Sequence, residues 1–556
     1  MPESMRWNVR DSFTAAGLFL ATAAFTLWQN TRVAVLWDLS YLLDSAWRFS
    51  LGQLPFRDLP FAHAPLTFLL HAALIRVLGR VYYPHIVCAA VESGLGTILT
   101  WLILRGLGSP RWLALALAVP LIVLGIYCVY PHPIYDSDAA LAVLLALYLL
   151  QKAEGSRSSP LSVLAGAACV LPVFFKQNIG LAFGGAIMLY VVVAGVCAVR
   201  RKNGVASQVW TLAGMAAAGL AALALIQFTV GLPSYFYWTV TFAAQRRMPG
   251  LPALLATYRQ QSLLWSIPAA VAGLILLRRS TTRWSRVVSF LLLSAPFLWT
   301  LISLTWTPDA DDRADQFLSL WPHVLILGAA MAIGNLRPTV LRDQPLFPAL
   351  LPLILLATID GTFLSQQLWG STYAIWPLFL LLVYLLLTAV PDVAKPLAWT
   401  IAGTLLVCGG LYSVSLERLS YIHLDGEMAH ATLPPLLRMS TQGPWLPHFE
   451  ELVSVVETEI PPEDQVLLIP GDVPFYFATG RTPRFPILLF DLAADPYTPQ
   501  QTLEQARAYG IRWLIVSRNP QLKGSSLPDL DEIVRVVTTD FVLQRQTAGY
   551  DIYRRR

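Results

Sequence analysis

Long apolar runs constrain this chain more than any other feature. Runs of about 18 or more mostly apolar residues recur from the N-terminus to about residue 416, and a helix of that length spans the hydrocarbon core of a bilayer. Charged residues make up 13% of the chain and hydrophobic residues 56%, whereas soluble domains carry about 25% charged residues. The sequence therefore predicts a polytopic α-helical membrane protein.

Counting these runs, with allowance for a few shorter ones, gives about thirteen transmembrane helices. They lie near residues 12–30, 81–104, 111–130, 136–152, 160–176, 178–199, 207–231, 258–278, 284–304, 316–334, 346–364, 370–390 and 396–416. The run 64–79 has about 14 apolar residues between polar ends, so we expect an interfacial or re-entrant helix there. If this run spans the membrane instead, every later connection changes sides.

Positive charge orients the predicted helices. With the N-terminus in the cytoplasm, every connection on that side is basic, as the positive-inside rule requires. The opposite connections, among them 31–80, 131–138 and 231–260, gather acids, aromatic residues and prolines, with irregular polar sequence in the longer ones. The net charge of +5 follows this bias and is too scattered to indicate a nucleic-acid partner.

Hydropathy falls after about residue 416, so the chain divides into a membrane domain, 1–416, and a soluble domain, 417–556. Within the second part, 466–480 reads as a buried strand and a turn, 498–510 as a helix capped by Thr498, and 511–517 as another strand. Strand, helix and strand predict a small α/β fold. The count of spans places this domain outside the cytoplasm.

The first outer connection, residues 31–80, is the candidate site. A connection between two spans needs few residues and no chemistry, yet this one carries six ionisable side chains among aromatic residues: Asp38, Asp44, Arg48, Arg57, Asp58 and His63. Residues 39–50 fit an amphipathic helix lying flat on the membrane, with Asp38 at its N-cap. Capping alone is one explanation of Asp38. Asp44 and Arg48, four residues apart, fit a surface ion pair.

A sequence motif extends through this connection. The pattern W-D-x-x-Y-x-x-x-x-A-x-x-x-x-x-G-x-x-P-F-R-D, followed by H-x-P-L and a helix ending in Leu-Gly, resembles the first outer loop of GT-C membrane glycosyltransferases. The family 39 type, which includes protein O-mannosyltransferases and the aminoarabinose transferases of lipid A, is the most similar. The matching positions are Trp37, Asp38, Tyr41, Ala46, Gly52, Pro55, Arg57, Asp58, His63, Pro65 and Gly79. A weaker likeness covers the layout of spans and the segment 476–481, YFATGR.

The resemblance implies a polyprenyl-phosphate sugar as donor, with Asp38 as the base toward an acceptor on protein, lipid or polysaccharide. It also implies a bacterial plasma membrane protein that needs no cofactor. Many relatives carry a second acid directly after the first, where this chain has Leu39. Relatives also place a lysine in this loop for the donor phosphate. This chain has none, so Arg57 or a later cation must substitute, with His63 as a further donor contact.

Other outer connections add candidates. Asp136 and Asp138 form an Asp-x-Asp pattern that resembles a divalent-metal motif of oligosaccharyltransferases. Relatives of the family 39 type commonly use one acid here without a required metal, so we favour Asp138 as a site carboxylate over a bound metal. Capping of a helix that begins at Ala139 explains both acids equally simply. Lys176 is a candidate contact for donor phosphate or sugar, or else a snorkelling lysine at the end of a span.

The later connections carry further cations. Arg246 and Arg247 stand beside four aromatic residues and suit a lipid-phosphate pocket, or simply anionic headgroups. In the acidic segment 307–316, Arg313 is a candidate donor contact, although a solvated loop is the simpler explanation. His323, within a span, fits a packed and hydrogen-bonded histidine.

Two functions of other classes remain open. A transporter or flippase of lipid-linked sugars would keep ionisable residues near the middle of the bilayer and often shows repeated halves, but here most acids fall in outer connections and no repeat is visible. A catalytically inactive glycan-binding relative is consistent with Leu39 and the missing lysine. A glycosyltransferase is the function that the sequence favours.

Overall fold

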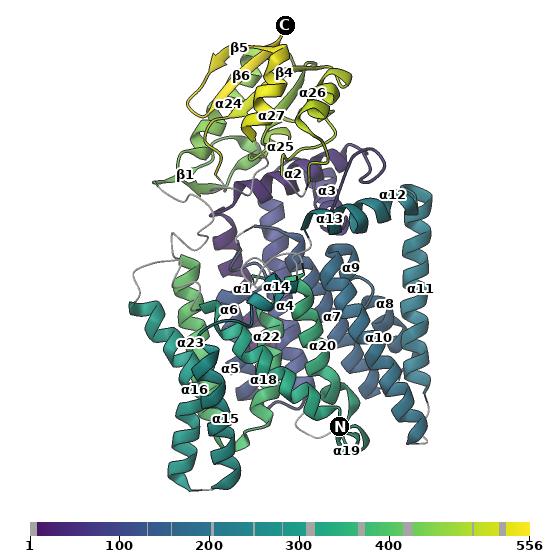
Figure 1. The fold of residues 1–556 in the computed structure, drawn as a ribbon, viewed down its shortest axis with the longest axis vertical. Helices are drawn as coiled ribbons and strands as arrows, with labels where there is room; N and C mark the ends of the chain where they lie inside the picture. The colour runs from purple at the N-terminus through teal and green to yellow at the C-terminus, as the bar shows by residue number, and fades with distance from the viewer. Residues whose placement is uncertain are drawn as a thin grey trace.

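The computed structural model describes residues 8–130, 132–156, 158–201, 205–247, 251–280, 282–306, 317–364, 373–414, 426–491, 494–521 and 530–556. Figure 1 shows a tall helix bundle with a smaller α/β domain at one end, and two helices, α2 (Leu36–Ser50) and α3 (Leu66–Leu78), between them. The predicted fold class, a polytopic helical membrane protein with a small C-terminal α/β domain, is therefore confirmed.

The bundle is built from helices of very different length. They are α1 (Val9–Asn30), α4 (Tyr82–Gly106), α5 (Arg111–Ala118), α6 (Leu121–Leu124), α7 (Tyr135–Ser156), α8 (Ser159–Ala168), α9 (Pro172–Phe175), α10 (Gln177–Arg200), α11 (Ala206–Thr229), α15 (Leu263–Arg279), α16 (Arg283–Trp306), α18 (Leu320–Asn335), α19 (Pro338–Asp343), α20 (Leu346–Phe363), α22 (Trp376–Thr388) and α23 (Pro391–Val414). Among the described residues, seven helices are long and apolar enough to cross a membrane. The count of thirteen spans is not confirmed.

Proline accounts for part of this difference. The apolar run 111–130 is divided into α5 and α6, with Pro120 at the N-cap of α6, and the run 160–176 is divided into α8 and α9, which starts at Pro172. Proline has no N–H to donate and clashes with the preceding turn, so an apolar run that contains it need not form one helix.

Small residues let α8 and α11 approach closely. A Cβ on Gly166 of α8 would lie 2.0 Å from the Thr211 carbonyl oxygen of α11, and a Cβ on Gly214 would lie 2.1 Å from the Val163 carbonyl oxygen. Neither position has room for a side chain. This packing of small residues is typical of helices that associate inside a membrane.

The connection 231–260 differs from its prediction. An irregular polar segment was expected, but the structure has α12 (Leu232–Phe236), a π-helical turn (Tyr237–Phe242), α13 (Ala243–Arg247) and α14 (Leu251–Ala256). Pro233 lies in the first turn of α12, where its missing N–H costs no hydrogen bond. The aromatic residues that follow provide apolar surface, and Tyr235 is buried.

The C-terminal domain contains a four-stranded sheet in the order β3 (Gln465–Ile469), β4 (Ile511–Ser517), β6 (Tyr550–Arg555) and β5 (Phe541–Gln546). β3 and β4 are parallel and are joined through α26 (Pro499–Ala508), as predicted, because a parallel pair needs a crossover. The predicted cap is confirmed, since Thr498 and Gln501 form a capping box. The other helices are α24 (Trp445–Glu459), α25 (Phe475–Thr479) and α27 (Leu530–Val537).

The first outer connection and this domain share one apolar core. Leu39 and Leu43 of α2 and Phe68 of α3 are buried in the same cluster as Phe449 and Phe477 of the C-terminal domain. A short hairpin, β1 (Met428–His430) and β2 (Ser440–Gln442), also joins the chain after α1 through backbone hydrogen bonds of Ser440. The domain is therefore fixed to the connection that the sequence marks as the candidate site.

Candidate functional site

Asp38 lies in the first turn of α2. The predicted N-cap position is wrong, because α2 starts at Leu36 and Val35 is its N-cap. Gln521 of the C-terminal domain supplies the cap: its Oε1 accepts from the Leu36 N–H at 2.9 Å, and its Nε2 donates to the Ala34 carbonyl at 2.7 Å. The Asp38 carboxylate is consequently available for other contacts and sits near the positive end of the helix dipole.

Tyr130, in the connection between α6 and α7, donates its hydroxyl hydrogen to Asp38 Oδ2. The Tyr130 ring is stacked on the Tyr373 ring, with 5.1 Å between the ring centres, and it contacts His132, with 4.5 Å between the ring centres. His132 is fully buried, and neither of its ring nitrogens has a hydrogen-bond partner among the described residues. Burial lowers the pKa of His132 to about 3, so the imidazole is neutral at physiological pH.

Asp38 opens on a small cavity. Its other walls come from the first outer connection, from the start of α7 and from the C-terminal domain: Tyr41, Leu42, His63, Phe68, Pro133, Ile134, Tyr135, Leu489, Asp491 and Ala494. His63 lies 3.3 Å from the Tyr41 hydroxyl through Nδ1, and its ring centre lies 5.0 Å from that of Tyr135. The structure thus brings Asp38 and His63, two of the predicted site residues, to one cavity.

Lys176 contacts the wall of this cavity through Tyr135. Its ammonium group forms an ion pair with Asp136 and lies 4.9 Å from the ring centre of Tyr135, a residue of the cavity wall. Both members of the pair are buried, with 6% of Lys176 and 7% of Asp136 exposed. A snorkelling lysine would extend to water, so this alternative does not describe Lys176.

Asp138 faces a different set of partners. It accepts hydrogen bonds from Thr67 of α3 and from Tyr127, whose hydroxyl also lies 3.1 Å from Glu92. Helix α7 starts at Tyr135, so the expected helix start at Ala139, with both acids as its caps, is wrong. Asp136 and Asp138 therefore have separate surroundings. The part of the chain that the structure describes contains no group of three or more His, Cys, Asp or Glu that fits a metal.

The remaining predicted cations are not joined to the cavity by a described contact. Arg57 is exposed and forms an ion pair with Asp58 at 2.8 Å, which lowers the pKa of the Asp58 carboxyl. Arg246 and Arg247 belong to α13, and their side chains lie outside the description. Arg313 also lies outside the described residues. His323 is buried and bonded to Ser266 at 3.1 Å, as predicted.

The prediction that Asp44 and Arg48 form an ion pair on the surface is wrong. Both are buried against the C-terminal domain. Asp44 accepts from the Phe477 N–H at 2.7 Å, while Arg48 donates to the carbonyl groups of Phe485 and Pro486. Burial raises the pKa of Asp44 to about 8 and lowers that of Arg48 to about 10. The polar face of α2 therefore binds the domain instead of facing water.

Sequence reasoning missed several contributors to the site. Tyr130 and Tyr135 precede the predicted acids Asp136 and Asp138 in the sequence, and the density of aromatic residues in this part of the chain was an available signal. Asp491 and Gln521 gave no signal, because neither lies in a motif and both reach the site only through the docking of the C-terminal domain.

These features define a polytopic helical membrane protein with an acidic cavity between its bundle and an α/β domain. No family model matches the chain, and no curated protein does. Among solved structures, it is similar to ArnT from Cupriavidus metallidurans bound to undecaprenyl phosphate, with 11% identity, 97% of each chain covered and a TM-score of 0.45.

It is also similar to an oligosaccharyltransferase from Archaeoglobus fulgidus. The apo form gives 13% identity over 90% of this chain and 69% of that chain, with a TM-score of 0.49. The oligosaccharyltransferase AglB from Archaeoglobus fulgidus, in complex with an inhibitory peptide and a dolichol-phosphate, gives 12% identity over 92% of this chain and 70% of that chain, with a TM-score of 0.48.

Proposed function

We propose that this protein is a glycosyltransferase that moves a sugar from a polyprenyl-phosphate donor to an acceptor hydroxyl, with Asp38 as the general base. The observation that carries the proposal is the position of Asp38. Its carboxylate is half-buried, held by Tyr130, and open to a cavity that three separate parts of the chain enclose. A general base needs such a fixed position within reach of the proton that it removes.

The proposed reaction is a single displacement. Asp38 takes the proton of the acceptor hydroxyl while its oxygen attacks the anomeric carbon of the sugar. The bond between that carbon and the phosphate oxygen breaks, and its electron pair leaves with the polyprenyl phosphate. A single displacement inverts the anomeric centre, and no nucleotide or metal is needed because the phosphate is already a good leaving group.

A cation has to stabilise the departing phosphate. Lys176 is the best placed of the described candidates, since its ammonium group lies against Tyr135 in the cavity wall. A donor phosphate would compete with Asp136 for this ammonium group. Arg57, Arg246, Arg247 and Arg313 remain candidates for the lipid-phosphate side of the donor.

The proposed site faces the outside of a bacterial plasma membrane, with the N-terminus in the cytoplasm. The length of α3 supports the placement of the connections of the site on one side of the membrane. Its 13 residues extend about 20 Å, which is less than the roughly 30 Å of the hydrocarbon core. If α3 does not cross, the connections after α1, α6 and α9 are on one side, together with the C-terminal domain that covers them.

The test is a reconstitution with three readouts. Purified protein in vesicles receives a radiolabelled polyprenyl-phosphate sugar and an acceptor extract from the cell envelope. Transfer of label to the acceptor supports the proposal. Movement of the donor across the bilayer without transfer would establish a transporter, and binding of glycan with neither event would establish an inactive relative.

A further inference from the structure

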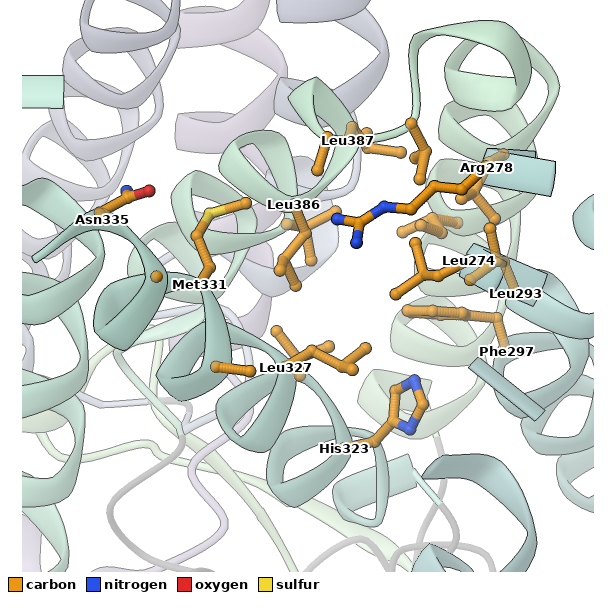
Figure 2. A pocket seen from close by; sticks show the side chains of 18 of the residues that line it. Leu274, Arg278, Leu293, Phe297, His323, Leu327, Met331, Asn335, Leu386 and Leu387 are labelled. Carbon is orange, nitrogen blue, oxygen red and sulfur yellow. The ribbon is translucent and has the colours of Figure 1, made fainter. Parts of the chain in front are cut away.

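An apolar cavity of the bundle lies away from the proposed active site. It has a volume of about 420 Å³, within the usual range of ligand pockets. Five helices form it, namely α15, α16, α18, α22 and α23, and most of its lining residues are apolar. Figure 2 shows Leu274, Phe297, Leu327 and Leu386 around the open space.

One end of this cavity is basic. Arg278 belongs to the last turn of α15, and Arg337 follows the end of α18. The Arg278 side chain extends across the cavity toward Leu386 (Figure 2). The lining contains no acidic residue, and within the described residues neither arginine has an ion pair. The far end is closed by His323, which is bonded to Ser266.

We propose that this cavity binds an anionic phospholipid of the inner leaflet, with an acyl chain in the apolar part and the phosphate between Arg278 and Arg337. The inference does not depend on the glycosyltransferase activity, but it rests on the proposed orientation, with this end of the bundle on the cytoplasmic side. Basic pockets between transmembrane helices on the cytoplasmic side are where anionic headgroups bind. Water is a poor occupant, because a buried water needs two to four polar partners and these walls offer few.

The position of the basic end argues against the sugar donor as the occupant. Arg278 and Arg337 are at the end of the bundle away from the C-terminal domain, as the places of α15 and α19 in Figure 1 show. The Asp38 cavity is at the other end, beneath that domain. A donor phosphate held by these arginines would be separated from Asp38 by the length of the bundle.

The neighbouring residue Arg279 provides a matched control. It is also exposed in the last turn of α15 but does not line the cavity. A snorkelling explanation treats Arg278 and Arg279 alike, because both carry the same charge at the same membrane depth. A phospholipid in the cavity would contact Arg278 and not Arg279, so only this explanation predicts that the two substitutions have different effects.

The test measures retained lipid by native mass spectrometry after purification in detergent with added phosphatidylglycerol, phosphatidylcholine or undecaprenyl phosphate. The variants are Arg278→Gln with Arg337→Gln, the control Arg279→Gln with Arg283→Gln, and Gly334→Phe. Gly334 lines the cavity and has open space at its Cβ position, so a phenylalanine there fills the cavity while both arginines remain.

We expect wild type and control to retain phosphatidylglycerol. Loss of the cavity arginines lowers retention by about fivefold for each one, and Gly334→Phe lowers it although the charges are intact. Circular dichroism on the same samples checks that each variant is folded. Equal retention by the cavity and control pairs would overturn the proposal. So would equal retention of phosphatidylcholine, or a preference for undecaprenyl phosphate.

Discussion

Asp38 and Tyr130 form the contact on which the proposed chemistry depends most. The Tyr130 hydroxyl donates to the Asp38 carboxylate, and the Tyr130 ring is held by Tyr373 and His132. A hydrogen bond donated to a carboxylate fixes its orientation and favours its charged form. Tyr130 is therefore a positioning residue for the base.

Tyr130→Phe tests this role. The ring and its stacking remain, but the hydroxyl is lost, so we expect transfer to fall by about tenfold, in line with a hydrogen bond to a charged group. We also expect the acid limb of the pH–rate profile to move to higher pH, because the charged carboxylate loses a donor. A lower rate with an unchanged profile would assign Tyr130 a purely structural role.

At the scale of single residues, the sequence predicted which side chains belong to the site better than it predicted which residues they contact. Asp38, His63 and Lys176 were all named from the sequence, and the structure places them in or against one cavity. The contacts of Asp38 with Tyr130 and of Lys176 with Asp136 were not predicted, because these partners come from other elements. The Asp44 and Arg48 spacing suggested a surface pair only because an isolated helix shows no sign of the domain that covers it.

Helix α2 joins the proposed site to the C-terminal domain. Ser40 donates to the carbonyl groups of Gly471 and Val473, Asp44 accepts from Phe477, and Trp47 donates to the Arg481 carbonyl. These contacts follow one face of α2, and Asp38 belongs to the same helix. Docking of the domain therefore also fixes the position of Asp38.

Asp44→Asn tests the docking of α2 through its pH dependence. Burial raises the pKa of Asp44 to about 8 from 3.8. The folded protein holds this proton where the unfolded chain has released it, so the stability from this group is lost as pH rises from about 4 to about 8. Asparagine keeps an acceptor for the Phe477 N–H without that loss.

We expect Asp44→Asn to raise the melting temperature by at least about 2 °C at pH 8 and to lose this advantage near pH 4. Asp58→Asn is the control. Its carboxyl is exposed and its pKa is lowered by Arg57, so its contribution has the opposite sign. A constant difference between wild type and Asp44→Asn at all pH values would contradict a buried, protonated Asp44.

Elements were predictable where one physical rule dominates. Long apolar runs gave α4, α7, α10 and α23, because a bilayer requires them, and the capping box gave α26. The prediction of elements failed where it rested on local sequence alone and the conformation depends on contacts with distant parts of the chain. The segments 232–247 and 251–256 lie among turn-forming residues and yet are helical. Aromatic side chains of the first segment pack on the first outer connection, as Tyr235 does on Phe56.

The molecule as a whole has two ends with different chemistry. One end holds the Asp38 cavity and the α/β domain, which supplies Leu489 and Asp491 to the cavity wall and Gln521 to the start of α2. The other end holds the basic turns between helices, including the one that joins α15 and α16. The proposed function requires the first end to be outside the cell and the second to be inside.

Cysteine labelling tests this orientation. Ser454→Cys places a thiol on the exposed face of α24, and Thr282→Cys places one in the turn between α15 and α16. A maleimide that does not cross membranes should label Ser454→Cys in intact spheroplasts and Thr282→Cys only after lysis. Wild type, whose five cysteines lie within or between bundle helices, gives the background. The reverse pattern would contradict the orientation and the proposed outer site.

The central claim is that Asp38 removes the acceptor proton during sugar transfer, and Asp38→Asn tests it most directly. The measurement is the rate of label transfer from a radiolabelled polyprenyl-phosphate sugar at saturating donor, with donor binding determined separately. The control is Asp540→Asn, an aspartate that pairs with Arg507 at 2.7 Å on the surface of the C-terminal domain. We predict a loss of at least about 100-fold for Asp38→Asn, with donor binding retained and the control unchanged. Transfer by Asp38→Asn at the rate of the control would contradict the assignment of the base.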